Sequence, residues 1–263
     1  MDLVDCFKKL SELIDNKIKF YWSENPRELV SKLFKYFDKI QKKSTEYMLN
    51  KLKPLIDKIP SQIGIPLEDL NSKALKDYED LYNYCSCIPI VGFNTGGYDI
   101  NTMLEYGFLD EVLKRDPAPY ILKSGKRYKA IKTTQFLFLD EMLYCAGGTS
   151  LEKFLKCYSK SKDDEKFQFP YKWLDSYDKL YNFIKDVPIE AFDNDLKKTK
   201  LTIEEYNQFQ TDCIKHNLNT VLDLLRFYNN RDVEPFVKAC IEYKKFFDDF
   251  KIDMYKDAFT LSG

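Results

Sequence analysis

One histidine, His216, is present in 263 residues, and the seven cysteines show no paired spacing. Because Cys85 and Cys87 are the only close pair, a zinc site of the usual Cys/His kind is excluded, and reduced thiols inside a cell are indicated. No apolar run approaches the roughly 20 residues that cross a bilayer, and the first residues lack a signal-peptide pattern. We therefore expect an intracellular protein with no membrane partner.

A basic excess is also missing, since 41 lysines and arginines are balanced by 42 acids, for a net charge of −1. Proteins that coat duplex nucleic acid usually carry clear positive charge, so any contact with DNA has to be confined to a local groove. The apolar content of 44% and the charged content of 32% are those of an ordinary globular protein. The length suits one large domain, or one domain with an appendage.

The first 60 residues predict a helical arm, because apolar residues recur there at helical spacing in three segments. Pro26 precedes the second segment at a position suited to a first turn, and Pro54 predicts a kink in the third. We divide the chain into an arm, residues 1–60, and a second region, residues 61–263.

The second region alternates between strand and helix patterns. Four short apolar runs predict strands, the first of them buried, at residues 88–93, 120–122, 128–131 and 135–140. The middle two flank Gly125 and predict a β-hairpin. Helical patterns dominate from Thr149 onward. Together these patterns predict an α/β fold with one mixed sheet.

The first segment informative for function is Gly92 to Asp99, where an apolar strand ends in a polar turn and a helix begins. Ligands of α/β folds usually bind at the carboxyl ends of strands, and glycines there allow backbone to approach a ligand closely. The segment Gly92 to Asp99 is therefore a candidate ligand-binding turn. The alternative is that Asn94 and Asp99 are only turn and N-cap residues.

The second informative segment is a predicted helix, residues 217–232. Four apolar residues form one stripe at helical spacing: Leu218, Val221, Leu222 and Leu225. The stripe continues to Tyr228 and Asp232, which share one helix face. A carboxylate on an inward stripe is costly unless it is paired or binds a metal. Alternatively, the helix ends near Arg231, before Pro235, and Asp232 lies in solvent.

These two segments resemble motifs of one enzyme class. Asn94 followed by Tyr98-Asp99 resembles the Exo II motif of DEDD-type exonucleases. The segment Tyr228-Asn-Asn-Arg-Asp232 resembles their Exo III motif, Y-x-x-x-D, in its tyrosine subclass. The histidine subclass would place histidine where Phe227 stands, so we expect the single histidine to be incidental.

Two further segments extend the resemblance to protein-primed family B DNA polymerases. Thr149-Ser150-Leu151-Glu-Lys-Phe154 resembles the (S/T)-L-x-x-hydrophobic motif of their exonuclease domain, and Lys166-Phe-Gln-Phe169 resembles the K-x-x-hydrophobic motif that follows. All four motifs stand in the order of that family. The context over residues 88–263 is most similar to polymerases of Maverick/Polinton-type mobile elements and related viruses.

The resemblance implies a 3′–5′ exonuclease that uses two divalent ions, Mg²⁺ or Mn²⁺, held by carboxylates. It implies Asp99 and Asp232 as metal ligands, and Tyr228 as the residue that orients the attacking water. It also implies contacts to the 3′ end of single-stranded DNA from Asn94, Tyr98, Ser150, Leu151 and Lys166.

Two parts of the family pattern are missing. The Exo I motif, Asp-x-Glu on an apolar strand, should precede Exo II, and its only match, Asp77-Tyr-Glu79, lies in a charged helical stretch. The polymerase motifs D-x-x-S-L-Y-P and Y-x-D-T-D are not found, and Asp253 to Gly263 resembles the junction into a polymerase module. We therefore expect an incomplete ribonuclease H-like exonuclease domain with a mixed sheet and a helical N-terminal arm, inactive by itself.

Three functions stay open. In the first hypothesis, the chain is the exonuclease region of a protein-primed DNA polymerase for replication and proofreading, in a nucleus or associated with a virus. Its partners would then be a single-stranded DNA 3′ end, a terminal protein primer and a polymerase module. Alternatively, it is a binding module for single-stranded DNA or for a protein, without chemistry. A third hypothesis is a helical scaffold in which the four motifs are coincidental.

Overall fold

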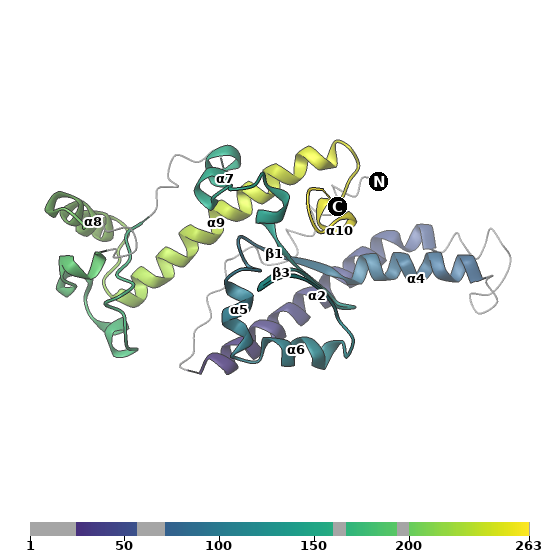
Figure 1. The fold of residues 1–263 in the computed structure, drawn as a ribbon, viewed down its shortest axis with the longest axis horizontal. Coiled ribbons are helices and arrows are strands. Elements are labelled where there is room, and N and C mark those ends of the chain that lie inside the picture. The colour runs from purple at the N-terminus through teal and green to yellow at the C-terminus, as the bar shows by residue number, and fades with distance from the viewer. Residues whose placement is uncertain (1–24, 57–71, 160–166, 194–199, 263) are drawn as a thin grey trace. The chain divides into compact units, whose positions relative to one another are not determined.

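The computed structural model describes residues 25–56, 72–159, 167–193 and 200–262 (Figure 1). The chain divides into two compact units. Over the described residues, unit 1 consists of 25–151 and 244–262, and unit 2 of 152–243. None of the described helices is both long and apolar enough to cross a membrane.

Unit 1 is built on a mixed four-stranded sheet with the order β1-β4-β3-β2. The strands are β1 (Ile88–Gly92), β2 (Tyr120–Ser124), β3 (Arg127–Lys132) and β4 (Phe136–Asp140). β1 runs parallel to β4, and β3 is antiparallel to both β4 and β2. The α/β fold, the four predicted strands and the predicted hairpin are confirmed.

The burial of the two parallel strands differs from the prediction for β1. β4 is buried at every residue, whereas every residue of β1 is only half-buried. The reason is that β1 is an edge strand among the described residues, so one side of it has no neighbouring strand. The parallel register places Gly92 beside Asp140, and both strands end at the same edge of the sheet.

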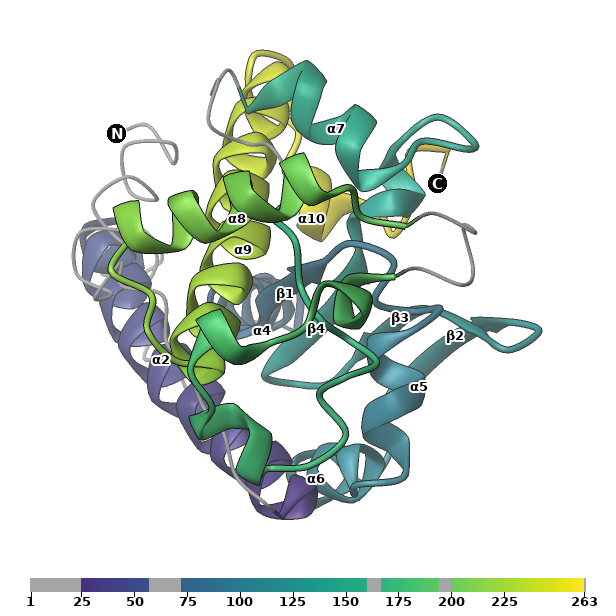
Figure 2. The ribbon, with the colours of Figure 1, turned by 90° about the vertical axis from the view of Figure 1, so that its left-hand side faces the viewer.

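Helix α2 (Pro26–Ile56) packs on the sheet together with α5 (Asp99–Leu104) and α6 (Phe108–Arg115) (Figure 2). Phe34 of α2 is fully buried, and its ring lies 5.4 Å from that of Phe108 and 6.3 Å from that of Phe136. An ion pair of 2.5 Å between Arg115 and Asp38 also joins α6 to α2. The described part of the predicted arm therefore belongs to the core of unit 1.

Two of the three helical segments predicted in the arm are joined in the structure. The second and third form one continuous helix that begins at Pro26, as expected, and has Pro54 in its last turn. Asn25 caps its start, since the side-chain oxygen accepts from the backbone N–H of Arg27 at 3.1 Å. The first predicted segment lies outside the described residues.

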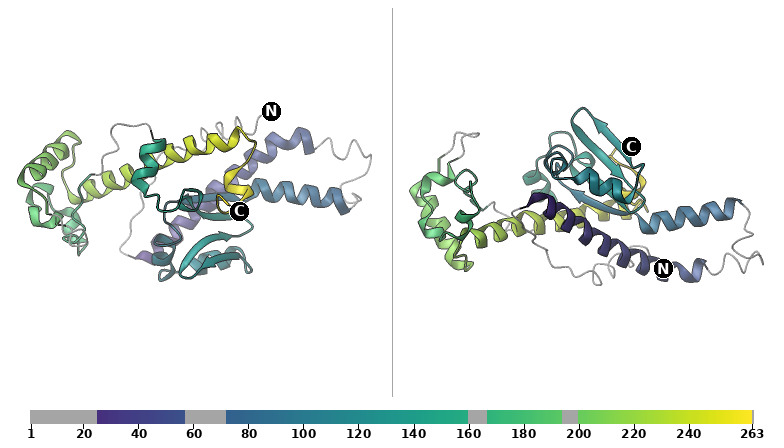
Figure 3. Two further views of the ribbon diagram at one scale, coloured as in Figure 1. Left: turned by 45° about the horizontal axis from the view of Figure 1, so that its top comes forward. Right: turned by 90° about the horizontal axis from the view of Figure 1, so that it is seen from below.

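Helix α4 (Ser72–Ser86) lies alongside the second half of α2 (Figure 3), and Met48, Leu52 and Cys85 form a small buried cluster between them. Asp77 and Glu79 are exposed on α4, so the only Asp-x-Glu is helical, as the sequence indicates. The six described cysteines are free thiols.

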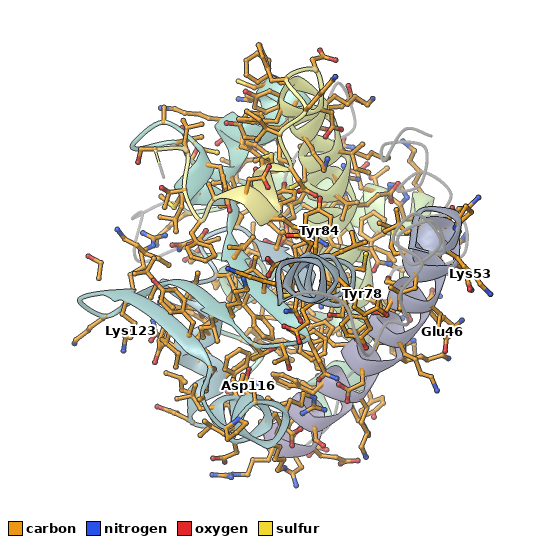
Figure 4. The ribbon with its side chains drawn as sticks, turned by 90° about the vertical axis from the view of Figure 1, so that its right-hand side faces the viewer. Glu46, Lys53, Tyr78, Tyr84, Asp116 and Lys123 are labelled. Atoms are coloured by element: carbon orange, nitrogen blue, oxygen red, sulfur yellow. The ribbon has the colours of Figure 1, made fainter. Side chains whose placement is uncertain are left out.

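The C-terminal segment of unit 1 packs back onto the chain through tyrosine hydroxyls. Tyr84, which lies on α4 (Figure 4), donates to Asp253 at 2.9 Å. Tyr255, in α10 (Met254–Asp257), donates to the fully buried Glu141 at 2.7 Å. These bonds fix residues 253–257 against elements that precede and follow the sheet.

Unit 2 has a core of its own, made of helices and 3₁₀ turns. Its helices are α7 (Leu151–Tyr158, whose first residue belongs to unit 1), α8 (Ile203–Lys215) and the part of α9 (Val221–Asp248) that ends at Tyr243. The buried cluster gathers apolar residues from 169–192, α8 and α9. The described residues of unit 2 contain no strand, in keeping with the predicted dominance of helices.

Helix α9 corrects the prediction at both of its ends. It begins at Val221 rather than at 217, because Asn217 adopts a left-handed φ of 55° and Thr220 caps the helix by accepting from Asp223 N at 3.2 Å. It continues through Pro235 to Asp248, so the alternative in which it ends near Arg231 is wrong.

The apolar stripe of α9 also differs from the prediction in its members. Val221 and Leu224 are fully buried, whereas Leu218, Leu222 and Leu225 are partly buried. All of them belong to the buried cluster of unit 2 or pack against it.

Candidate functional site

The predicted Exo II residues lie in a turn that connects β1 to α5, here called the Asn94 turn, residues 93–99, of which Asp99 is also the first residue of α5. Asn94 adopts a left-handed φ of 59°, a conformation that asparagine tolerates better than most residues. Its carbonyl oxygen accepts from the backbone N–H groups of Gly97 and Tyr98, both at 3.1 Å. The turn is thereby closed just before Asp99 begins α5.

A buried carboxylate from β4 holds this turn in place. Asp140 is 1% exposed and accepts from the backbone N–H groups of Asn94 at 2.8 Å, Gly96 at 3.3 Å and Met142 at 3.1 Å. Arg127 donates to the same carboxylate at 3.1 Å. A buried charge is costly unless it is paired and hydrogen-bonded, and these four donors meet that need.

Arg127 also reaches the side chain that forms the turn. Its Nη2 donates to Asn94 Oδ1 at 2.6 Å as well as to Asp140. Asn101 of α5 adds a second tie, because its Nδ2 donates to the carbonyl oxygens of Gly97 at 3.1 Å and Lys126 at 3.3 Å. The β2–β3 hairpin therefore fixes the turn from one side.

The glycines of the turn serve close packing within the chain. A Cβ on Gly96 would lie 1.7 Å from the backbone oxygen of Tyr128, whose N–H donates to Gly96 O at 3.0 Å. A Cβ on Gly97 would lie 2.8 Å from Asn94 Oδ1. These glycines were expected to allow the approach of a ligand. At Gly96 the backbone that approaches is instead that of β3.

Three of the predicted residues are exposed on this rigid turn: Asn94, Tyr98 and Asp99. The ring of Tyr98 is 68% exposed, so a large aromatic surface is available for stacking. Desolvation raises the pKa of Asp99 above its ordinary value, and the negative charge of Asp140 adds to the rise. The turn thus presents an amide, an aromatic ring and a carboxyl to solvent.

The other predicted DNA contacts are less fully defined. Ser150 is exposed and Leu151 is half-buried, at the start of α7. Both stay predicted contacts. Lys166 lies outside the described residues.

The predicted Exo III residues belong to unit 2, where Tyr228 is a core residue. Its ring is 6% exposed and lies 5.2 Å from that of Phe169, and its hydroxyl accepts from Tyr171 at 2.6 Å. Burial raises the pKa of Tyr228 well above its ordinary value, and the negative charge of Asp232 adds to the rise. Asp232 itself is exposed on α9, so the expectation that it lies on the inward stripe is wrong, and the exposure to solvent that the alternative predicted is confirmed.

The single histidine has a packing role. His216 follows the last residue of α8, and its ring lies 4.6 Å from that of Phe227.

The predicted site residues form two groups, one in each unit. That Asp99 and Asp232 hold the same metal ions stays a prediction.

The side chains at the Asn94 turn supply few of the ligands needed by the two divalent metal ions that the resemblance implies. At the Asn94 turn, Asp99 is exposed, while Asp140 is engaged by Arg127 and backbone N–H groups. Within the described ranges, no three His, Cys, Asp or Glu side chains gather in a way that could hold a metal ion. The residues of the turn do not by themselves fit a pair of Mg²⁺ or Mn²⁺ ions, and we derive no metal-dependent step from them.

Asp140 and Arg127 are the site residues that the sequence analysis missed. The available signal was the position of Asp140 at the end of the strand run 135–140, which matches the position of Asn94 after 88–93.

The chain matches no family model, and neither a search of curated proteins nor a search of solved structures finds a match.

Proposed function

We propose that this chain is the 3′–5′ exonuclease region of a protein-primed family B DNA polymerase, and that its Asn94 turn binds the 3′ end of single-stranded DNA. The observation that carries the proposal is the exposure of Asn94, Tyr98 and Asp99 on a backbone held by the buried Asp140. The order of the four motifs supports the family, and a mixed sheet with α5 after β1 is compatible with a ribonuclease H-like fold.

The physical role of the turn follows from what it exposes. Aromatic stacking contributes about 1–3 kcal/mol per base and tolerates any sequence, which suits the exposed ring of Tyr98. Because the turn is already closed by hydrogen bonds, little ordering is needed on binding. With a net charge of −1, long-range attraction is small, so affinity should be weak and confined to this turn.

Cleavage in this proposal requires acids in addition to those of the turn. β1 is an edge strand among the described residues, and an open strand edge is able to pair with a further strand. A strand carrying the Exo I acids is the occupant that the proposal predicts there. The chain alone should therefore show no Mg²⁺-dependent or Mn²⁺-dependent degradation of single strands, and degradation that Asp232→Ala abolishes would contradict this expectation.

Fluorescence anisotropy with a labelled oligonucleotide at low salt tests the binding role. Tyr98→Ala should weaken binding about tenfold, since roughly 1.4 kcal/mol is a factor of ten. Tyr82→Ala is a matched control, because Tyr82 is an exposed tyrosine on α4, before the opposite end of β1. Equal binding by wild type and Tyr98→Ala excludes the turn as the site, and no binding by the wild type favours the scaffold hypothesis.

A further inference from the structure

The β2–β3 hairpin, residues 120–132, carries positive charge without any acid. Residues 117–139 contain neither Asp nor Glu, whereas over the whole chain 42 acids balance 41 basic residues. The basic residues of the hairpin are Lys123, Lys126, Arg127, Lys129 and Lys132. The net charge of −1 therefore conceals a strongly basic segment beside the Asn94 turn.

The four lysines of the hairpin form no ion pair with a described residue, and only Arg127 is paired, with Asp140. All four are exposed except Lys129, which is half-buried. Lys123 lies near the tip of the hairpin (Figure 4). Like charges at this density repel one another, so a bound polyanion would lower the electrostatic energy of the hairpin.

Two structural explanations account for only part of this charge. Lysines of a solvated surface often lie beside acids, as Lys32 lies 2.8 Å from Glu28 on α2, and the hairpin offers no acid. Lysines on an edge strand discourage pairing with another sheet, but of the four only Lys123 lies on β2, the edge strand. Lys129 and Lys132 belong to β3, which is paired on both sides.

The hairpin is continuous with the Asn94 turn. The backbone N–H of Tyr128 donates to Gly96 O at 3.0 Å, and Asn101 Nδ2 donates to the carbonyl oxygens of both Gly97 and Lys126. Exposed rings flank the cations, since Tyr98 on the turn is 68% exposed and Tyr120, the cross-strand partner of Lys132, is 53% exposed. Cations that follow a backbone, with rings on which bases stack, are typical of surfaces that hold single-stranded nucleic acid.

We propose that the β2–β3 hairpin binds the phosphodiester backbone of the single strand whose 3′ end lies at the Asn94 turn. This role rests on the proposed function and goes beyond it, because it assigns a second surface to lysines that belong to none of the four motifs. A lysine ammonium is a point charge with three donors, so it holds phosphates without reading the bases. Lys126, Lys129 and Lys132 contact phosphates in this arrangement, and Tyr98 contacts a base.

The salt dependence of binding measures these contacts. For a single strand, each neutralised phosphate contributes about 0.7 to the slope of log affinity against log salt. The slope is obtained by fluorescence anisotropy with labelled oligo(dT) between about 50 and about 200 mM salt. The triple variant Lys126→Gln, Lys129→Gln and Lys132→Gln should reduce the steepness of the slope by about 2 and weaken binding at low salt. Lys126→Gln alone, at an exposed turn position, should reduce it by about 0.7.

A matched control removes the same charge from another surface of unit 1. Lys35, Lys39 and Lys42 are exposed on α2 and form no ion pair with a described residue. Changing these three to Gln should leave the slope nearly unchanged. An equal loss in both triple variants would show that only the net charge acts, and it would overturn the hairpin as the site.

A methylphosphonate oligo(dT) isolates the phosphate contact, because its backbone is uncharged and its bases are the same. The wild type and the hairpin variant should bind this probe equally, with almost no salt dependence. Weaker binding of the probe by the hairpin variant would overturn the backbone contact.

Labelled poly-glutamate with the same number of charges tests an acidic protein segment as the partner. It should bind more weakly than oligo(dT), because it offers Tyr98 no base. Equal or tighter binding that the hairpin variant loses would assign the hairpin to an acidic protein and overturn the proposal.

The two proposals fail in different ways. Tyr98→Ala should weaken binding of oligo(dT) but keep the slope of the wild type, since stacking releases no counterions. Binding that depends on Tyr98 but not on the hairpin lysines sinks the hairpin proposal alone. Binding that depends on the lysines but not on Tyr98 removes the Asn94 turn and supports the hairpin as the site, and no binding removes both.

Discussion

The Asn94 turn of unit 1 and the Tyr228 segment of unit 2 resemble two motifs of one enzyme class, yet they are built in opposite ways. At the turn the motif side chains are exposed, and the groups that hold them, the buried Asp140 and the partly buried Arg127, come from other strands. On α9 the motif tyrosine is itself part of the core, and its hydroxyl is bonded to Tyr171.

The difference shows what each motif does before any ligand is present. In the turn, buried polar contacts hold exposed groups in place, which is the arrangement expected of a preorganised binding site. Tyr228 stabilises the fold of unit 2, so its type and spacing are already explained by packing. A motif match is therefore stronger evidence for function at Asn94 than at Tyr228.

The largest effect should follow from removing the anchor of the turn. Asp140→Ala leaves Arg127 and two backbone N–H groups of the turn without their acceptor, and each buried donor left unsatisfied costs about 1–3 kcal/mol. Asp110→Ala is the matched control, since its ion pair with Arg27 is 3.8 Å long and exposed, and it should cost under about 1 kcal/mol. Urea unfolding followed by circular dichroism measures both. Equal losses would show that the buried pair is not what holds the turn.

In unit 2 the corresponding anchor is apolar. Leu224→Ala should cost about 2–5 kcal/mol, because the side chain is fully buried. Leu222→Ala should cost only about 1 kcal/mol, because its side chain is partly in water already. Trp173 packs against the same cluster, so its fluorescence in a Trp22→Phe background reports the urea unfolding of this unit. A larger loss for Leu222 than for Leu224 would contradict the observed stripe.

Tyr228→Phe sharpens the contrast between packing and binding. It removes one hydroxyl from the bond with Tyr171 and should cost about 1 kcal/mol of stability. Binding of single strands, measured by anisotropy, should not change if Tyr228 is a packing residue. A loss comparable to that of Tyr98→Ala would place Tyr228 at the binding site and remove the distinction between the two regions.

The smallest effect concerns the charge of Asp99. Without divalent ions, Asp99→Asn should bind single strands about two- to threefold more tightly at neutral pH, because one exposed negative charge is removed. The pKa of Asp99 is raised, so the wild type should approach the variant as the pH falls through that pKa, while the variant stays constant. Because the pKa of Asp99 is raised in the folded state, the ionised carboxyl lowers the free energy of unfolding at pH values above that pKa. Asp99→Asn removes this charge and should stabilise unit 1 slightly. Weaker binding by Asp99→Asn would show that the carboxyl contacts the strand favourably.

The strands, the hairpin and the exposed groups of the turn were predictable because their signals are local. Alternation and apolar runs mark a strand without knowledge of its neighbours, and a polar residue directly after such a run lies at the edge of a sheet. Asn94, Tyr98 and Asp99 could therefore be selected from the sequence alone.

Asp140 and Arg127 could not be assigned because their roles depend on strand order. Nothing local states that β4 lies beside β1, or that β3 lies on the far side of β4. The alternative in which the helix ends before Pro235 was wrong for a related reason. A proline within a helix costs about 3 kcal/mol, and α9 passes through it because Tyr228, Pro235 and Ala239 are buried along the same side of the helix.

The parallel pairing of β1 with β4 has a consequence for the order of folding. The β2–β3 hairpin joins neighbouring segments and should form within about 1–10 μs, whereas Ile88 must find Phe136 across two helices and that hairpin. Closing such a long loop comes late. Because Asp140 reaches the turn only after this closure, the exposed residues of the turn should acquire their arrangement in the last folding step. Pulse-labelling hydrogen exchange should show amides of 127–132 protected before those of Asn94 and Gly96.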